Sequence, residues 1–153
     1  MSDEISKMES DMKISQKIDS SAVIDLLSAY QNFASRYADD SLSPEYLYKA
    51  AGLATGFSLG NQAVEIYESI IHTYPGYRKI PECYFMEAFT YENVIGDNAK
   101  AYEYYNEFLN KYPQHDLADD ARAAIKFLGK SPDELVREFE KMRNPDSVTA
   151  VSK

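Results

Sequence analysis

The 153-residue sequence predicts an all-α fold in which antiparallel helix pairs stack into a solenoid. Three observations indicate this fold class. A pair of tyrosines recurs at intervals of 37 and 38 residues, prolines and glycines interrupt the chain at matching places, and the apolar residues between them follow helical spacing. A period of this length is typical of stacked helix pairs, in which each pair buries its apolar surface against its neighbours.

The tyrosine repeat sets the register of the chain. The second tyrosine follows the first by seven residues in each copy, and the pairs are Tyr30 and Tyr37, Tyr67 and Tyr74, and Tyr105 and Tyr112. Because the first tyrosine recurs where a stacked repeat needs a large buried side chain, we expect it to lie in the core rather than on a ligand surface.

Two regular units, about 44–77 and 81–115, are each expected to form two helices. Pro44 and Pro81 suit the first turn of a helix, where the missing N–H has no partner to lose. Turns are expected near Gly60 and Gly96. A proline then follows the second tyrosine of each unit, and the residue before a proline avoids the helical region. The second unit carries one extra residue at its turn.

The flanking segments complete a single domain over residues 1–143. Residues 20–38 are expected to form an N-terminal half-repeat, with a segment containing Ile5, Met8 and Met12 as the candidate partner helix. Residues 117–143 are expected to form a C-terminal capping pair that turns near Gly129. Its last helix is predicted to face inward with Leu135, Val136, Phe139 and Met142. Residues 144–153 lack periodicity and are expected to form a flexible tail.

Composition excludes several classes of partner. The formal net charge of −9 disfavours nucleic acid and anionic lipid surfaces. No apolar run approaches the ~20 residues of a membrane span.

The N-terminus lacks the features of a targeting segment, which leaves a cytoplasmic protein or a chain whose export segment is missing. Cys83 is the single cysteine and is expected to pack as a small apolar residue.

At these positions the chain resembles the tetratricopeptide repeat family. The first unit carries its pattern at Leu47, Ala50, Ala51, Ala54, Ala63, Tyr67 and Pro75, and the second at Tyr84, Glu87, Ala88, Tyr91, Ala101, Tyr105 and Pro113. A third, one residue short, aligns Asp120, Ala123, Ala124, Phe127, Leu135 and Phe139. The resemblance implies a right-handed superhelix whose concave face, lined by first helices, binds a protein or peptide partner.

One sub-type resembles the sequence more closely. The Tyr-Pro ends and the segment Leu117-Ala118-Asp119-Asp120-Ala121 are similar to repeats of bacterial periplasmic and outer-membrane lipoproteins of the Tol–Pal accessory and outer-membrane assembly types. This similarity implies a location at the periplasm or outer membrane.

Recognised catalytic and cofactor motifs are absent from the sequence. It has no Gly-rich phosphate loop, no CxxC and no HExxH, so neither a cofactor nor enzymatic activity is predicted. His115 lies near Asp116, Asp119 and Asp120 in sequence. We interpret these acids as a solvated helix start rather than a metal site, because acids favour the positive end of the helix dipole.

The predicted binding surface follows from the helical offset between core and groove positions. Its candidate residues are Tyr48, Gly52, Thr55, Phe85, Phe89, Glu92 and Asn93. This set has no basic residue, so binding of acidic chaperone tails is not expected. For Phe85 and Phe89, groove and core placement remain equal alternatives. Two other functions remain open: self-association as the dimerisation module of a cell-envelope lipoprotein, and an enzyme with an unrecognised site.

Overall fold

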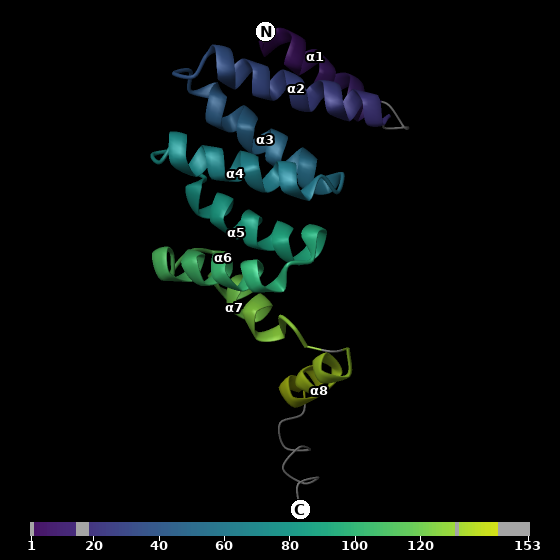
Figure 1. Ribbon diagram of the computed structural model, residues 1–153, viewed down its shortest axis with the longest axis vertical. Helices are drawn as coiled ribbons and strands as arrows, with labels where there is room; N and C mark the ends of the chain where they lie inside the picture. The colour runs from purple at the N-terminus through teal and green to yellow at the C-terminus, as the bar shows by residue number, and fades with distance from the viewer. Residues whose placement is uncertain (1, 15–18, 131, 144–153) are drawn as a thin grey trace, which may run out of the picture.

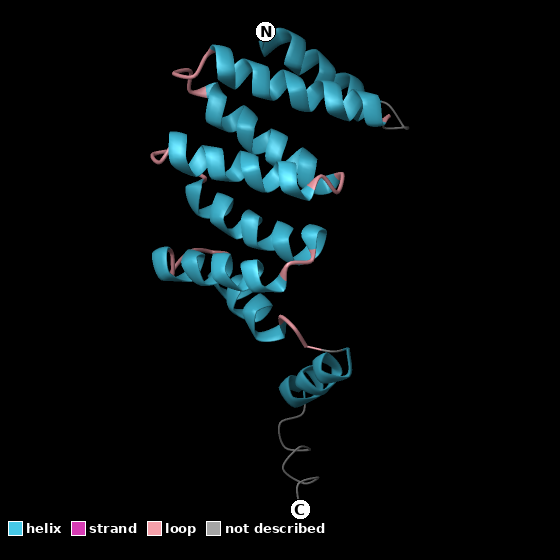
Figure 2. Cartoon of the chain, in the orientation of Figure 1, coloured by secondary structure: helices cyan, strands magenta, loops and turns pink. Residues whose placement is uncertain are grey.

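The computed structural model describes residues 2–14, 19–130 and 132–143, and every regular element in these ranges is a helix (Figure 2). In chain order the helices are α1 (Ser2–Ile14), α2 (Ser20–Arg36), α3 (Leu42–Gly56), α4 (Gly60–Thr73), α5 (Ile80–Thr90), the π-helical turn η1 (Tyr91–Ile95), α6 (Asn98–Lys111), α7 (Ala118–Phe127) and α8 (Pro132–Arg143). The predicted all-α class is confirmed for this part of the chain.

The helices form a stack of antiparallel pairs: α1 with α2, α3 with α4, and α5 with α6 (Figure 1). Each helix from α1 to α6 also packs against the next one along the chain, so neighbouring pairs are in contact from α1 to α7. We call α1, α3, α5 and α7 the first helices, and α2, α4 and α6 the second helices. Figure 1 shows α8 set apart beyond α7 at the C-terminal end of the stack.

The second tyrosine of each sequence repeat ends a second helix with the same geometry. Tyr37, Tyr74 and Tyr112 have φ values of −123°, −125° and −133° and ψ values of 55°, 60° and 58°. In each case the backbone N–H still donates to the carbonyl oxygen four residues earlier, at 2.7–2.8 Å. The residue before a proline avoids the helical region, which accounts for Tyr74 and Tyr112. The sequence period is therefore the structural period.

The first tyrosine of each repeat is buried, as predicted. Tyr30 is 4% exposed, and Tyr67 and Tyr105 are each 1% exposed. Within each regular pair, fully buried alanines lie where the two helices meet, namely Ala51, Ala63, Ala88 and Ala101. Small residues at these places let the helix axes approach, while the tyrosines fill the space toward the neighbouring pair.

The extra residue of the second unit is accommodated by the π-helical turn η1. The N–H groups of Gly96 and Asp97 both donate to the carbonyl oxygen of Tyr91, at 2.8 and 2.9 Å. Gly96 has a φ of 82°, which suits glycine because it has no Cβ. The turn packs closely on the start of α4: a Cβ at Gly60 would lie 2.6 Å from Cγ1 of Ile95. Single π turns of this kind absorb one inserted residue within a helix.

The structure agrees with the predictions for the N-terminal end of the chain, but only in part with those for the C-terminal end. The candidate N-terminal partner helix exists as α1, and its Ile5 is only 1% exposed. At the other end Gly129, with a φ of 76°, follows α7 as predicted. The expectation that Val136 faces inward is wrong, because this side chain is 55% exposed on α8. The side chains of Leu135, Phe139 and Met142, and the predicted tail at 144–153, lie outside the described residues.

The predicted register of the third unit is also wrong. The N–H of Ala118 donates to the carbonyl of His115, as the N–H of Ile80 donates to the carbonyl of Tyr77, so these turns correspond. Ala118 and Ala121 consequently become the buried residues of α7, at 2% and 0% exposure. The sequence alignment instead matched Asp120, Ala123, Ala124 and Phe127 to the earlier units, and Asp120 and Ala123 are exposed.

Candidate functional site

The predicted binding residues lie on α3, α5 and η1, and we call this surface the first-helix face. Tyr48 on α3 is half-buried, with its ring centroid 6.0 Å from that of Tyr67 and 6.4 Å from that of Tyr77. The ammonium group of Lys79 lies 4.7 Å from the centre of the Tyr48 ring. Gly52, one turn further along α3, is exposed, and a Cβ there would meet no atom within 4 Å. The surface above α3 is therefore open at Gly52.

The two phenylalanines of this face have different environments. Phe85 packs edge-on against Tyr105 and Phe108 of α6, with centroid distances of 5.6 and 5.7 Å. Phe89 is 37% exposed. It lies 37 residues after Gly52, at the same place in the next first helix. Phe85 is thus partly buried against the core, whereas Phe89 is exposed on the surface.

Glu92 and Asn93 of η1 are held by neighbours within their own repeat. The carboxyl group of Glu92 accepts a hydrogen bond from the Tyr105 hydroxyl at 2.7 Å. Together with burial, this contact raises the pKa of Tyr105. Asn93 is exposed and donates from Nδ2 to the carbonyl oxygen of Phe89 at 3.1 Å. The amide oxygen of Asn93 is left to face solvent beside the exposed ring.

Thr55 contacts the adjacent first helix rather than solvent alone. Its Oγ1 donates to the carbonyl oxygen of Ala51 at 2.9 Å and lies 3.2 Å from Oγ1 of Thr90. Thr90 is fully buried on α5 and donates to the carbonyl oxygen of Met86 at 2.6 Å. Thr55 therefore belongs to the joint between α3 and α5 more than to an open surface.

A repeated contact between a glutamate and a basic side chain, which the sequence predictions missed, links α3 and α5 each to the loop after the following second helix. Arg78 donates from Nη2 and Nε to Glu45 Oε1, at 2.8 and 3.1 Å. Thirty-seven residues on, His115 Nε2 lies 3.2 Å from Glu82 Oε1. The N–H of Leu117 donates to Nδ1 of His115, so Nε2 carries the proton in the neutral ring. The common spacing of both pairs was the signal that would have revealed them.

The acids near His115 do not gather around it. Asp119 pairs with Arg122 at 2.9 Å, while the imidazole of His115 is occupied by Glu82 and a backbone N–H. Within the described ranges, no group of three or more histidine, cysteine or carboxylate side chains is placed to hold a metal ion.

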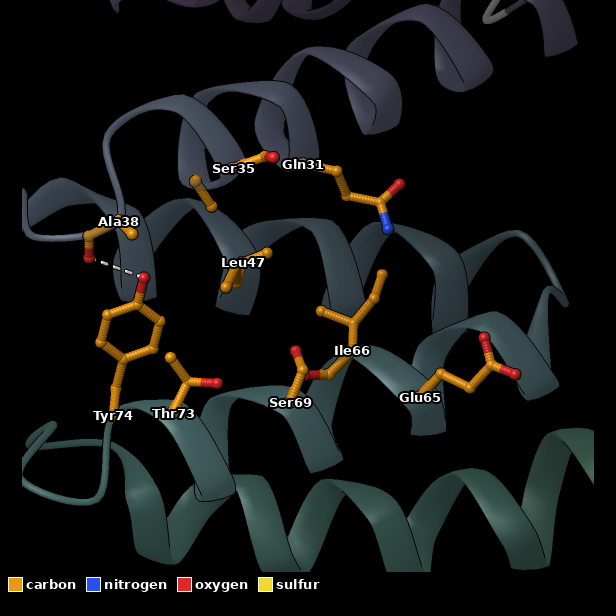
Figure 3. Close-up of a pocket in the computed structure, with 10 residues that line it drawn as sticks. Gln31, Ser35, Ala38, Leu47, Glu65, Ile66, Ser69, Thr73 and Tyr74 are labelled. Atoms are coloured by element: carbon orange, nitrogen blue, oxygen red, sulfur yellow. Dashed lines mark hydrogen bonds between the residues drawn. The ribbon is translucent and has the colours of Figure 1, made fainter.

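A groove of about 380 Å³, which we call the first seam, lies between the second helices α2 and α4 (Figure 3). Leu47 of α3 forms its floor, and its walls carry Gln31, Ala34, Ser35 and Ala38 on one side and Glu65, Ile66, Ser69 and Thr73 on the other. At one end the Tyr74 hydroxyl donates to the carbonyl oxygen of Ala38 at 2.8 Å, and Glu65 stands at the other end. No sequence prediction pointed to this groove.

The corresponding line between α4 and α6, the second seam, has larger and more acidic side chains. Each position that lines the first seam has an equivalent position one repeat later, which lines the second seam. The equivalent residues are Tyr84 for Leu47, Tyr104 for Ile66, Ile71 for Ala34, Glu68 for Gln31 and Glu107 for Ser69. The Tyr104 hydroxyl crosses the seam and donates to Glu68 Oε1 at 2.6 Å. The Tyr84 ring lies 6.0 Å from that of Tyr112, and Lys111 sits over it at 5.7 Å. The chain's own aromatic side chains therefore occupy the second seam.

A fully buried carboxyl group lies beneath the second seam. Glu87 of α5 is 0% exposed, and the carboxyl groups nearest to it are those of Glu68 and Glu107, with Glu68 close enough to accept a hydrogen bond from the protonated group. Burial, reinforced by the negative charges of Glu68 and Glu107, raises the pKa of Glu87 to about 10. Glu87 is consequently protonated at neutral pH. Its counterpart in the first unit is the buried Ala50, and no sequence prediction singled out this difference.

Residues 82–115, which span α5, η1, α6 and the loop that follows, match the tetratricopeptide repeat family. A comparison with curated proteins finds no match for the chain. Repeats of this family generally mediate protein–protein interactions and generally lack catalytic activity. None of the described helices has the length and apolar character needed to cross a membrane.

Proposed function

We propose that this chain, one unit of which matches the tetratricopeptide repeats, is a non-catalytic scaffold that holds a segment of a partner protein against its first-helix face. The observation that carries the proposal is the exposure of Phe89 on α5, which is 37% exposed although Phe85, one turn earlier, is partly buried against Tyr105. Exposed aromatic side chains on a surface not needed for folding often anchor a partner.

The surroundings of Phe89 suit an extended segment. Gly52 occupies the same place in the preceding first helix and leaves room for a backbone to pass. The free amide oxygen of Asn93 accepts hydrogen bonds, and its second N–H donates them, as a peptide backbone requires. A segment that contacts Phe89 and continues toward Gly52 would bind across two consecutive repeats.

The charges near this face disfavour an acidic terminal peptide. The candidate residues include no basic side chain, Arg78 pairs with Glu45, and the ammonium group of Lys79 lies over the ring of Tyr48. We therefore propose that acidic chaperone tails are not ligands. Calorimetric titration of such a peptide should show no binding in the micromolar range, and micromolar affinity would contradict this part of the proposal.

A photo-crosslinking amino acid at Phe89 tests the proposed face. Placed at this position in producing cells, it should yield discrete adducts, whereas the same residue at the exposed Asn32 of α2 should not. The identified partner is then purified and titrated against wild type and Phe89→Ala. We expect at least a tenfold loss of affinity with an unchanged melting temperature. Equal adduct formation at both positions, or unchanged affinity of Phe89→Ala, would refute the proposal.

Self-association is the second candidate function, and the exposure of Val136 on α8 favours it. An apolar side chain left open at the end of a solenoid can pack against a second copy. Light scattering after size exclusion distinguishes the two functions, because a stable dimer that Val136→Glu converts to monomer supports self-association. We also propose, from the Tyr-Pro ends and the Leu117–Ala121 segment alone, a bacterial envelope location, which cell fractionation tests.

A further inference from the structure

We infer that the first seam, between the second helices α2 and α4, is a docking site separate from the first-helix face. It takes an aromatic side chain, preferably tyrosine, from a partner segment that carries a lysine or arginine beside it. This inference does not depend on the proposed role of Phe89. It rests on the comparison of the first seam with the second, on the space that the first seam leaves open, and on the charge at its rim.

The repeat itself shows why the first seam has space. The second seam is filled by Tyr84 and Tyr104, and the first seam has the smaller Leu47 and Ile66 at these places. The tyrosine caps have nearly the same geometry in both repeats, and the smaller side chains leave a groove of about 380 Å³. A cavity of ~150 Å³ is enough to hold a benzene ring. The groove therefore has room for one phenol ring supplied by another chain.

The polar groups of the groove are suited to a phenol. In the second seam the Tyr104 hydroxyl donates to Glu68, and the first seam has Gln31 at the place of Glu68. Figure 3 shows the Gln31 amide reaching into the groove toward Ile66. A ring lying on Leu47 and Ile66 would bring its hydroxyl to the amide of Gln31, whose nitrogen lies on the side facing Ile66 (Figure 3) and can donate to the phenol oxygen. This contact favours tyrosine over phenylalanine, because only tyrosine carries a hydroxyl that can pair with the amide.

The charge at the rim comes from Glu65, which is exposed at the open end of the groove. It is the single charged side chain among the residues that line the groove, and it makes no ion pair with any described residue. The chain as a whole carries a formal charge of −9. A basic residue next to the partner's tyrosine would pair with Glu65, whereas an acidic one would be repelled.

The test uses a phage-displayed library of random 12-residue peptides selected on the wild-type chain, followed by calorimetry with the synthetic consensus peptide. Two variants fill the groove from opposite walls, Ser35→Phe on α2 and Ser69→Phe on α4; both serines are exposed. The matched control is Ser28→Phe, an exposed serine of α2 that does not line the groove. Phe89→Ala reports separately on the first-helix face. Circular dichroism confirms that every variant is folded.

We expect the consensus to contain a tyrosine next to lysine or arginine. Its affinity should fall at least tenfold in both groove-filling variants and about threefold in Glu65→Gln, and should not change in Ser28→Phe or Phe89→Ala. Selected peptides without an aromatic residue, or failure to select any, would overturn the inference. The inference would also be overturned if Phe89→Ala abolished binding of the selected peptide while both groove-filling variants still bound it. That result would support the proposed function instead. If the wild type is a dimer and Ser69→Phe makes it monomeric, the occupant of the first seam is a second copy of the chain. This result would also overturn the inference.

Discussion

The two seams between second helices share one backbone plan and differ in what fills them. In both, a tyrosine caps the helix on one wall with nearly the same φ and ψ, and a first helix forms the floor. Apart from Glu65 at one end, the first seam is lined by uncharged side chains and stays open, whereas the second is closed by the Tyr104–Glu68 hydrogen bond. A few substitutions at fixed repeat positions thus decide whether a seam is core or surface, without any change in helix arrangement.

The same contrast continues beneath the seams. Ala50 lies under the first and is fully buried, and its counterpart Glu87 lies under the second, equally buried but bearing a carboxyl group. A buried carboxyl group destabilises a fold when it must ionise, and neighbouring negative charges increase this cost. The second seam is therefore better packed with aromatic side chains and at the same time electrostatically strained. Variants that act on one seam and spare the other can separate these two properties.

The largest expected effect is on the pH dependence of stability, through Glu87→Gln. The folded chain keeps the Glu87 proton up to about pH 10, while the unfolded chain releases it above the ordinary pKa of 4.5. The contribution of Glu87 to the free energy of unfolding is therefore fully present below pH 4.5 and is lost as the pH rises toward 10. At about 1.4 kcal/mol per pH unit, wild type should lose ~4 kcal/mol relative to Glu87→Gln between pH 5 and pH 8.

Urea unfolding of both chains at pH 5, 6, 7 and 8 measures this difference. Glu103→Gln, an exposed carboxylate of α6, is the control and should follow wild type at every pH. If the free energies of unfolding of wild type and Glu87→Gln change in parallel with pH, the carboxyl group of Glu87 does not stay protonated in the folded chain. The electrostatic contrast between the two seams would then be wrong.

The next effect tests whether the two repeats differ only at their seams. Ala51→Leu and Ala88→Leu place a bulky side chain in the contact within each helix pair, where both alanines are fully buried. Overpacking of this kind costs about 1–3 kcal/mol. Because the contact within the pair is built alike in both repeats, we expect similar losses of unfolding free energy in chemical denaturation. A melting temperature unchanged by either substitution would show that its alanine is not at the helix contact.

Much of the fold was predictable because its signals are local. Prolines and glycines mark the loops, and the recurring first tyrosines mark the core. The extra residue between Ala88 and Ala101 was visible as a change of spacing, but its conversion into a π turn depends on packing of Ile95 against Gly60, which no local pattern contains. Val136 was misplaced because helical periodicity identifies an apolar face without showing whether another helix covers it.

The candidate site was predictable only in part. Phe85 and Phe89 are four residues apart and share one side of α5, so spacing could not separate them. They differ because Tyr105 and Phe108 of α6 reach Phe85 and leave Phe89 partly open. The first seam was missed for another reason. Its character depends on residues that are small relative to their repeat counterparts, and a search for chemically distinctive residues passes over Ala34 and Ser69.

The smallest expected effect compares the hydroxyl groups that bridge the two seams. Tyr104→Phe removes a bond to a carboxyl group at 2.6 Å, and Tyr74→Phe removes a bond to the backbone carbonyl of Ala38 at 2.8 Å. Bonds to charged groups contribute about 1.5–3 kcal/mol and neutral ones about 0.5–1.5 kcal/mol. Both tyrosines are half-buried, so water competes for each bond and we expect losses near the lower end of each range. Urea unfolding at pH 7 should therefore rank Tyr104→Phe below Tyr74→Phe in stability.

Because the Glu68 bond closes the second seam, Tyr104→Phe should also raise hydrogen exchange in α6, whereas Tyr74→Phe should leave exchange in α4 nearly unchanged. Equal losses in both variants would mean that the hydroxyl bridge does not distinguish the closed seam from the open one, and that the difference lies in the volume of the side chains alone.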